Sequence, residues 1–393
     1  MRENSRREFV KVLGGSTVAV TVSLAGCSNG DDGSGDDGGS DSGSDTDGSD
    51  GDSQEFQTIT ETGVPIPKTK LENWYKTERT DLYAETMSET GYELEIETTF
   101  EDLPLFLGGN AQIAESMGAL EAAEIGIERD EQFAAHAKTG GQHTALYVKI
   151  GSKWDPDKTG SVEATIDKLV EEGGTFAIGG WGLGTIPAYS LIFQEKYGYD
   201  FSEGGDFNVV TSALPSLAQL VAEEKAAVGT SAPSYGSYGY TAGADDPVLK
   251  PIFWMQSEME DTGIDSGTLQ LGNAITRKSF SDENIEAMKA YVAASKQAVE
   301  WIQNNIDTIV EDQEMREILG YGSKEATRYI LEWRYLAEHS ENTVPPSNGD
   351  LALTDEYIQA EKETIAKAQS LGAVKSGWED YIEFKNVDIS AYL

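Results

Sequence analysis

A regular succession of strand-like and helix-like segments constrains the fold of this chain more than any other feature. Residues 92–99 alternate apolar and acidic side chains, as a strand with one buried face does. Residues 161–172 place their apolar side chains on one helical face, and Gly173-Gly174 follows as a stop signal. Residues 175–178 predict a buried strand. Such alternation predicts parallel sheets covered by helices.

The same patterns extend over residues 68–393, which is more chain than one hydrophobic core usually supports. We therefore expect two lobes. Further strands are expected at 71–75, 112–116, 132–137, 145–150, 207–211, 226–230 and 273–278, and further helices at 78–90, 102–109, 118–127, 186–197, 216–224, 282–304, 311–319, 324–337 and 354–370.

The composition is strongly acidic, with 69 Asp and Glu against 29 Lys and Arg and a formal charge of −40. Such a surface repels nucleic acid and anionic lipid headgroups, so neither is expected as a partner. Because the acidic excess runs along the whole chain, it indicates adaptation to high salt, where screening weakens self-repulsion. Seven Trp and seventeen Tyr argue against general disorder.

The N-terminus carries three export signals in order. Twin arginines lie within Ser5–Lys11, and an apolar stretch at 12–24 follows that is too short to span a membrane stably. The stretch ends in Leu24-Ala25-Gly26-Cys27, which resembles a lipobox. Residues 1–26 are therefore predicted to be a twin-arginine lipoprotein signal, with Cys27 lipidated. Cys27 is the only Cys, which excludes an intramolecular disulfide and a Cys-based metal site.

Residues 27–55 begin at the lipidated Cys and continue almost entirely in Asp, Gly and Ser. They offer almost no apolar side chain for a core, and their carboxylates repel one another. We expect a disordered acidic linker between lipid and domain.

A glycine loop at 179–185 lies between a predicted strand and a predicted helix. Glycines let a backbone approach a ligand, and a helix N-terminus offers free N–H donors for an anion. Thr185 stands where a dinucleotide fingerprint needs its third glycine, and no Lys follows as in a nucleotide phosphate loop. A simple tight turn is the alternative interpretation.

Several segments follow one another in a fairly specific order. They are residues 107–116, the strand 145–150, the glycine loop, residues 213–222 and 226–233, and the strand 273–278 before a long helix. Over residues 70–304 this order resembles the nitrate/sulfonate/taurine type of ABC importer binding proteins, whose wider group includes thiamine-precursor binders.

The resemblance implies an α/β, type II periplasmic-binding fold. In this fold two parallel or mixed-sheet lobes close over a ligand cleft. On this chain the first lobe would be 68–150 plus 250–393, and the second 151–249. Ligands of such open sheets bind at the carboxyl ends of the strands.

That rule names a candidate site at the predicted strand ends and on the glycine loop. The alternatives are core aromatics for the Trp residues and ordinary helix caps for the hydroxyl residues. The ligand-binding residues it names are Trp74, Tyr75, Ser116, Met117, Trp181, Gly182, Gly184, Thr185, Thr211, Ser212, Ser231 and Tyr235.

None of these loops holds Arg or Lys, so an anion would rely on hydroxyls and helix N-termini. The chain is therefore expected to be a lipid-anchored, extracytoplasmic solute-binding protein. It would deliver a small organic or inorganic anion, such as a sulfonate, taurine or nitrate, to an ABC importer permease. An aromatic or zwitterionic ligand is also open, and we expect a monomer.

Two alternatives keep the same fold. One is a thiamine-precursor or pyrimidine binding protein or enzyme, although no His is expected on the pocket loops. The other is a ligand-sensing or partner-binding lipoprotein without a transporter. His136 and His143 bracket a glycine turn, but ordinary structural use is the better interpretation than a metal pair. No catalytic residue, metal or cofactor is therefore assigned.

Overall fold

The computed structural model describes residues 57–393, apart from 80–86, 88, 142, 182, 263–269, 337–346, 348–349 and 373. The described residues all belong to one unit, Gln54–Leu393. The predicted signal, Cys27, the predicted linker, Gly182 and most of the predicted helix 78–90 lie outside the described residues.

The first sheet has six strands in the order β11-β4-β10-β3-β1-β2. Strand β10 is antiparallel to both of its neighbours, while the other pairs are parallel. The strands are β1 (Gln57–Gly63), β2 (Tyr92–Thr98), β3 (Ile113–Met117), β4 (Phe133–Gly141), β10 (Gln270–Arg277) and β11 (Ile382–Phe384).

The second sheet has five strands in the order β7-β6-β8-β5-β9. Here β5 is antiparallel to β8 and β9, whereas β6 is parallel to β7 and β8. Both sheets are therefore mixed, and the fold class expected from the sequence is confirmed. The strands are β5 (Ala145–Lys149), β6 (Thr175–Ile178), β7 (Asn208–Thr211), β8 (Val228–Ser231) and β9 (Leu249–Trp254).

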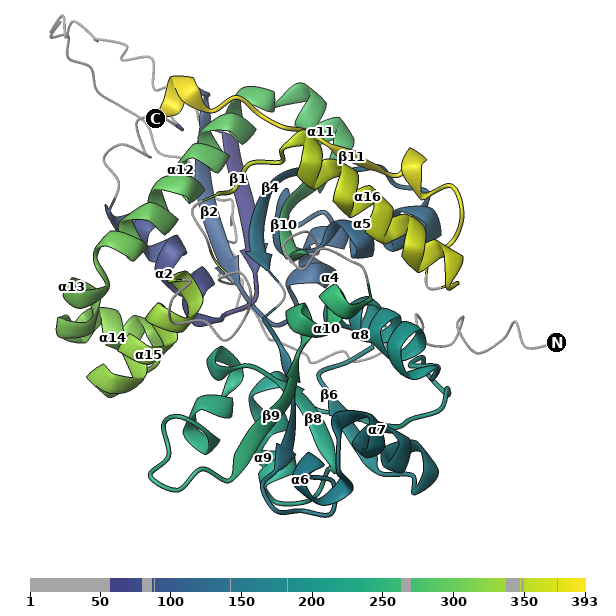
Figure 1. Cartoon of the computed structure of the whole chain (residues 1–393). Helices are drawn as coiled ribbons and strands as arrows, with labels where there is room; N and C mark the ends of the chain where they lie inside the picture. The colour runs from purple at the N-terminus through teal and green to yellow at the C-terminus, as the bar shows by residue number, and fades with distance from the viewer. Residues whose placement is uncertain are drawn as a thin grey trace, which may run out of the picture. The chain divides into compact units, whose positions relative to one another are not determined.

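Helices surround each sheet (Figure 1). Those that pack on or beside the first sheet are α2 (Pro67–Trp74), α4 (Asp102–Leu107), α5 (Ala119–Arg129), α11 (Lys278–Glu283), α12 (Ile285–Asn304) and α16 (Asp355–Ser370). Those around the second sheet are α6 (Pro156–Thr159), α7 (Val162–Glu171), α8 (Thr185–Ile192), α9 (Leu217–Ala222) and α10 (Met255–Asp261). A further group beside α2 is α13 (Ile306–Glu311), α14 (Gln313–Leu319) and α15 (Lys324–Tyr335).

The helix boundaries follow from local capping chemistry. At α7, Ser161 Oγ accepts a hydrogen bond from the backbone N–H of Ala164 at 3.0 Å, and at α15, Ser323 does the same for Ala326 at 3.0 Å. Gly173, with φ +63, follows the last turn of α7 in a conformation that favours glycine.

The expected strand at 71–75 is wrong, because these residues are helical. Pro67 starts α2 at a position where a missing N–H costs nothing, and the chain continues beyond Trp74 as a π-helical turn, Tyr75–Arg79. The folded region also begins earlier than the predicted residue 68. Strand β1 has one strongly apolar residue, Ile59, and buries Glu61 and Thr62, so its sequence lacks the pattern of a core strand.

The division between the sheets also differs from the expected lobe boundary at residue 150. Strand β5 pairs with β8 and β9, so residues 145–149 belong to the second sheet. The chain therefore crosses between the sheets after β4 and again between β9 and β10. We propose these two crossings as the lobe boundaries.

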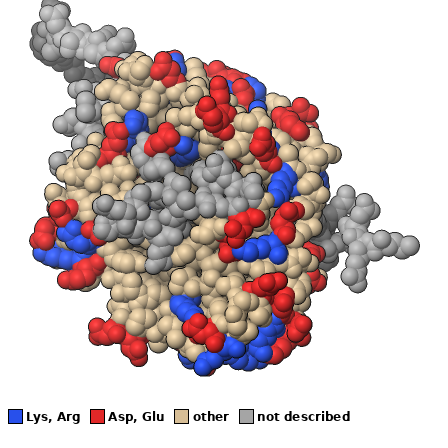
Figure 2. Space-filling model, in the orientation of Figure 1, with Lys and Arg blue, Asp and Glu red and all other residues tan. Residues whose placement is uncertain are grey.

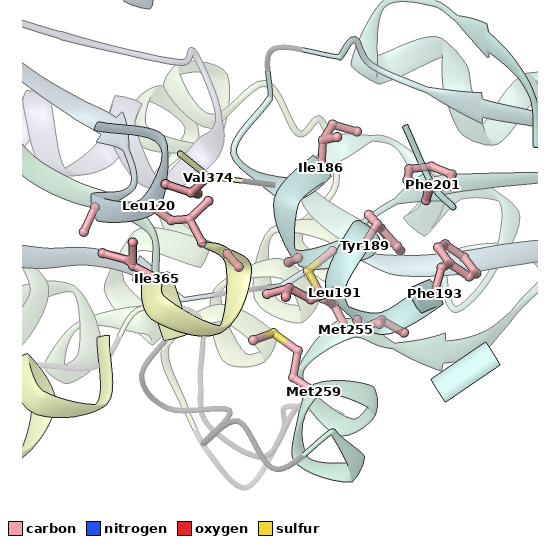
Figure 3. Close-up of a cluster of buried hydrophobic side chains, with 14 of the residues drawn as sticks. Leu120, Ile186, Tyr189, Leu191, Phe193, Phe201, Met255, Met259, Ile365 and Val374 are labelled. Atoms are coloured by element: carbon pink, nitrogen blue, oxygen red, sulfur yellow. The ribbon is translucent and has the colours of Figure 1, made fainter. Parts of the chain in front are cut away.

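One hydrophobic core includes side chains from both sheets and from the helices between them. In Figure 3, Leu120 of α5 and Ile365 of α16 lie on one side, and Tyr189 of α8 lies on the other. Met255 and Met259 of α10 lie between them. This packing holds α8 and α10 against the helices of the first sheet.

On the face shown in Figure 2, acidic side chains are spread over the surface with Lys and Arg among them. Several lysines pair with two carboxylates, as Lys196 does with Glu258 at 2.5 Å and Asp261 at 2.6 Å. Within the described residues, no helix is both long enough and apolar enough to cross a membrane.

Candidate ligand-binding site

A cavity of about 100 Å³ lies where the two sheets meet. Its walls come from the start of α2, from the ends of β3, β4 and β8, from the N-terminus of α8, and from α15. The lining residues are Val64, Ile66, Lys68, Thr69, Glu115, Ser116, Thr139, Gly140, His143, Thr144, Leu183, Gly184, Thr185, Leu214, Thr230, Ser231, Tyr235, Gly272 and Arg334.

Five residues named from the sequence line this cavity. They are Ser116, Gly184, Thr185, Ser231 and Tyr235. Ser116 and Ser231 lie at the carboxyl ends of strands that face the cavity, and Tyr235 follows the second of these strands. Gly184 and Thr185 lie at the start of the helix that follows such a strand. This is where the general rule for open α/β sheets places ligands.

The other named residues that the structure describes do not line the cavity. Trp74 and Tyr75 pack against Trp301, with ring centroids 5.7 and 5.4 Å apart. Met117 is buried in the core, and Trp181 stacks obliquely on Phe201 at 5.6 Å. These side chains serve packing rather than the cavity.

The end of β7 does not reach the cavity either. Thr211 is exposed and Ser212 is half-buried. They lie outside the cavity because β7 is the outermost strand of its sheet, two positions away from β8. The position of a strand within the sheet decides which strand ends converge, and the sequence pattern does not give that order.

A buried ion cluster forms one wall. Lys68 Nζ contacts Glu115 Oε1, and it lies 3.1 Å from Glu72 Oε2. Burial alone would raise the pKa of Glu115, but the ammonium groups of Lys68 and Lys76 more than offset it, so that pKa is lowered. Burial of Lys68 is likewise outweighed by the two carboxylates, which raise its pKa. Both groups are charged at neutral pH.

Behind this wall, Lys76 Nζ lies 2.9 Å from Glu61 Oε2, and both side chains are fully buried. Burial raises the pKa of Glu61 to about 7 in spite of that ammonium group. Tyr335 donates a hydrogen bond of 3.0 Å to Glu72 Oε1. These contacts hold Glu61 and Glu72 in place.

Arg334, near the end of α15, also lines the cavity. Its side chain is 1% exposed, and its Nε donates to Ser347 Oγ at 3.1 Å. Within the described part of the chain its Nη1 has no hydrogen-bond partner, and no carboxylate there forms an ion pair with it. A buried guanidinium without a counter-ion is costly, which makes this the most informative group of the site.

His143 and Tyr235 close the cavity on the side of the second sheet. His143 Nδ1 lies 2.8 Å from the carbonyl oxygen of Gly141, and Nε2 lies 2.9 Å from the Tyr235 hydroxyl. A carbonyl can only accept, so Nδ1 carries the proton and Nε2 accepts from Tyr235. Burial, assisted by the charge of Arg334, lowers the pKa of His143 to about 3, so the ring is neutral.

Ser231 at the end of β8 supplies a further polar atom. Its side chain is 1% exposed, and its Oγ has no hydrogen-bond partner among the described residues. Ser116 Oγ, in contrast, accepts the backbone N–H of Val64 at 3.0 Å. Ser231 is thus available to a ligand, whereas Ser116 also fixes the chain after β1.

In the glycine loop, the position that requires a glycine is Gly179 and not Gly184. Gly184 has φ −57 and ψ −13, which any residue can adopt. A Cβ on Gly179 would instead lie 2.5 Å from Leu183 Cδ1 and 2.6 Å from Leu214 Cδ2. Because both leucines line the cavity, Gly179 allows the loop to fold tightly against its apolar side.

The loops named from the sequence hold no Lys or Arg, but Lys68, Arg334 and His143 also line the cavity. These residues lie outside the strand-end loops from which the site was predicted. One sequence signal was present for Arg334, which falls on the same helical stripe as Ile330 and Leu331. A basic residue on the apolar stripe of a predicted helix indicates a buried charge.

Among the residues that the structure describes, no group of three or more His, Cys, Asp or Glu side chains is arranged to hold a metal ion. Both ring nitrogens of His143 are engaged. His136 Nε2 lies 3.1 Å from Thr276 Oγ1, within the first sheet.

Comparison with solved structures shows the same architecture. The periplasmic nitrate-binding protein NrtA from Synechocystis PCC 6803 aligns over 84% of this chain and 86% of its own, at 12% identity and a TM-score of 0.59. The periplasmic aliphatic sulphonate binding protein SsuA from Escherichia coli aligns over 86% and 91%, at 10% identity and a TM-score of 0.54.

The ligand-binding component of an ABC-type import system from Staphylococcus aureus, with zinc bound, aligns over 83% of this chain and 96% of its own. The identity is 13% and the TM-score 0.54. No family model matches the sequence, and no match was found among curated proteins. At these identities the likeness establishes the fold, which is the periplasmic-binding-protein fold.

Proposed function

We propose that this chain is an extracytoplasmic solute-binding lipoprotein that passes a small solute with an anionic group to an ABC importer permease. Cys27 would hold the lipid, and the acidic linker would connect it to the binding domain. We expect a monomer that works outside the cell membrane. The observation that carries the proposal is Arg334, a buried cavity-lining guanidinium with no counter-ion among the described residues.

The physical argument concerns the cost of a buried charge. Removing a guanidinium from water costs several kcal/mol unless an anion and hydrogen bonds compensate. Arg334 makes one side-chain hydrogen bond, to Ser347, and its Nη1 remains unsatisfied. An anionic group in the cavity would supply the missing acceptor, and an arginine is well suited to bind planar oxyanions in a bidentate way.

Cavity size restricts the ligand further. A cavity of roughly 150 Å³ holds a benzene molecule, and this one measures about 100 Å³. A small solute is therefore a better match to the cavity than a substituted pyrimidine in the conformation described. The names of the similar proteins, which bind nitrate or sulphonates, agree with a small oxyanion.

A binding role fits the site better than a catalytic one. His143 is the residue that a pocket acid or base would require, but its Nδ1 faces a backbone carbonyl and its Nε2 accepts from Tyr235. It therefore has no free nitrogen for proton transfer to a ligand.

The test is a thermal-shift screen of nitrate, bicarbonate, acetate, methanesulfonate and taurine on the protein and two variants. Arg334→Gln removes the cavity guanidinium. Arg328→Gln is the matched control, since Arg328 lies on the same helix but is exposed and paired with Asp307 at 2.6 Å. We expect melting temperatures that rise with the logarithm of solute concentration in the parent and in Arg328→Gln. Equal responses in Arg334→Gln would refute the proposal.

A further inference from the structure

The cavity presents a second unsatisfied charged group besides Arg334. Glu115 on β3 is 3% exposed and lines the cavity. Lys68 occupies its Oε1, while its Oε2 has no hydrogen-bond partner among the described residues. The ammonium groups of Lys68 and Lys76 outweigh burial and lower its pKa, so this oxygen belongs to a carboxylate and can only accept.

Glu115 and Arg334 line the same cavity, and the guanidinium helps to lower the pKa of the carboxylate. Thr139 Oγ1 donates to the backbone carbonyl of Glu115 at 2.6 Å. The next residue along β4 is Gly140, and a Cβ placed there would lie 3.8 Å from Arg334 Nη2. Strand β4 therefore neighbours the backbone of Glu115 and the guanidinium of Arg334.

Glu115 and Arg334 leave one charged oxygen and one charged nitrogen without a hydrogen-bond partner among the described residues. A ligand with only a negative group could bind Arg334 but would leave Glu115 Oε2 buried without a donor. A ligand with one positive and one negative group satisfies both.

We infer that the ligand is a small zwitterion, with an ammonium group that donates to Glu115 Oε2 and an anionic group that accepts from Arg334. This inference rests on the proposed function and narrows it to amino acids and aminosulfonates. Ser231 Oγ offers a further hydrogen bond to the anionic end, since it also lacks a partner among the described residues.

The apolar part of the cavity lining limits the size of the ligand segment that joins its two charged groups. Val64, Ile66, Leu183 and Leu214 surround the cavity with apolar side chains. These side chains suit a short hydrocarbon link, and a cavity of about 100 Å³ leaves room for few carbon atoms. Long polar substituents would lose their hydration without gaining partners.

The experiment is calorimetric titration of the full chain with three matched pairs. The pairs are glycine and acetate, β-alanine and propionate, and taurine and ethanesulfonate, and the members of each pair differ only in the ammonium group. For at least one pair we expect the zwitterion to bind about 10- to 100-fold more tightly, as a hydrogen bond between two charged groups predicts. The pair with the largest difference in affinity reports the distance between the two charged groups of the preferred ligand.

Two variants locate the effect. Glu115→Gln keeps the size of the side chain but removes its charge, so the zwitterion should lose the 10- to 100-fold preference and the monoanion should bind at least as well as before. Glu72→Gln is the matched control, because Glu72 is also a partner of Lys68 but does not line the cavity. It should retain the preference.

The possible failures are distinct. If neither member of any pair binds, the proposed function fails together with the inference. If monoanions bind as tightly as their zwitterionic partners in the parent protein, the inference alone is wrong. An equal loss of both ligand types in Glu115→Gln and Glu72→Gln would assign Glu115 a structural role and would also overturn it. Unfolding curves of both variants show whether each remains folded.

Discussion

Tyr235 and His143 connect the two sheets through a partly buried side-chain hydrogen bond. Tyr235 follows β8 of the second sheet, and its hydroxyl lies 2.9 Å from Nε2 of His143, in the crossing after β4. The rings also contact each other, with centroids 5.2 Å apart. Because both residues line the cavity, this bond fixes one of its walls as well as the geometry of the crossing.

We predict that Tyr235→Phe lowers the free energy of unfolding by about 1–3 kcal/mol, since it leaves the buried Nε2 of His143 without a donor. The ring contact should remain. Urea denaturation of parent and variant measures the difference. A matched control is Tyr199→Phe, whose hydroxyl binds Asp167 at 2.8 Å in a less buried place; its cost should be smaller. Equal costs would contradict the role given to the bond between Tyr235 and His143.

The pH dependence of stability follows from the buried histidines. Burial lowers the pKa of His143 to about 3, from 6.5 in the unfolded chain. Between these values the unfolded state binds more protons, so the stability that His143 contributes is complete above pH 6.5 and is lost as the pH falls toward 3. The shift corresponds to at most about 5 kcal/mol.

His143→Gln tests this directly. Between pH 4 and 6 the slope of unfolding free energy against pH should decrease by roughly 1.4 kcal/mol per unit, the contribution of one proton. Burial raises the pKa of Glu61 to about 7, so Glu61 acts in the opposite sense between pH 4.5 and 7. The comparison between parent and variant cancels that contribution. A slope unchanged by the substitution would show that His143 is not held neutral.

The elements with strong local signals were predictable, and the convergence of distant residues was not. Strand β6 matches its predicted range residue for residue. Glycines lie on both sides of its four residues and restrict where the strand can begin and end. Strand β1 was missed, because its buried Glu61 is compensated by Lys76 fifteen residues later. A sequence pattern cannot show that partner before the fold is known.

The candidate site shows the same limit. Ser231 and Tyr235, which were expected from the sequence, line the cavity because they end or follow a strand whose carboxyl end faces it. Arg334 and Lys68 come from helices that reach the cavity through tertiary packing. Thr211 was placed in the site because every predicted strand end was treated alike, but β7 is the edge strand. Strand order depends on long-range pairing, which one sequence does not show.

We predict that Cys27→Ser releases the protein from the membrane fraction without preventing its export. The physical reason is that a thioether-linked lipid supplies the anchoring energy, whereas the linker has almost no apolar side chain. Cell fractionation and immunoblotting measure the distribution. A variant in which Arg6 and Arg7 are both Lys is the control and should stay inside the cell. Membrane retention of Cys27→Ser would contradict the lipid anchor.

A further prediction concerns ionic strength. The formal charge of −40 is screened over about 3 Å at 1 M salt but over about 10 Å at 0.1 M. We therefore expect the unfolding midpoint to fall as KCl is diluted from molar to millimolar concentrations. Circular dichroism during thermal melts at constant pH provides the measurement. A midpoint that does not change with salt would argue against adaptation to a saline environment.

The last prediction concerns Gly184, which lines the cavity at the N-terminus of α8. Its φ of −57 and ψ of −13 are open to valine, so Gly184→Val should not strain the backbone. Valine is a poorer N-cap than glycine, and the expected loss of stability is about 0.5–2 kcal/mol. Its branched side chain would occupy part of a cavity of about 100 Å³ and should abolish binding of the small zwitterions.

The control is Gly151→Val, because Gly151 has φ +73 and does not line the cavity. Valine is strained at that φ, so this variant should lose about 1–3 kcal/mol of stability and keep its affinity. Thermal melts and calorimetric titration of both variants separate the two effects. Normal binding by Gly184→Val would exclude the N-terminus of α8 from the ligand site, whatever the melting temperature. Loss of binding in Gly184→Val, together with retained binding in Gly151→Val, would place the ligand against this helix.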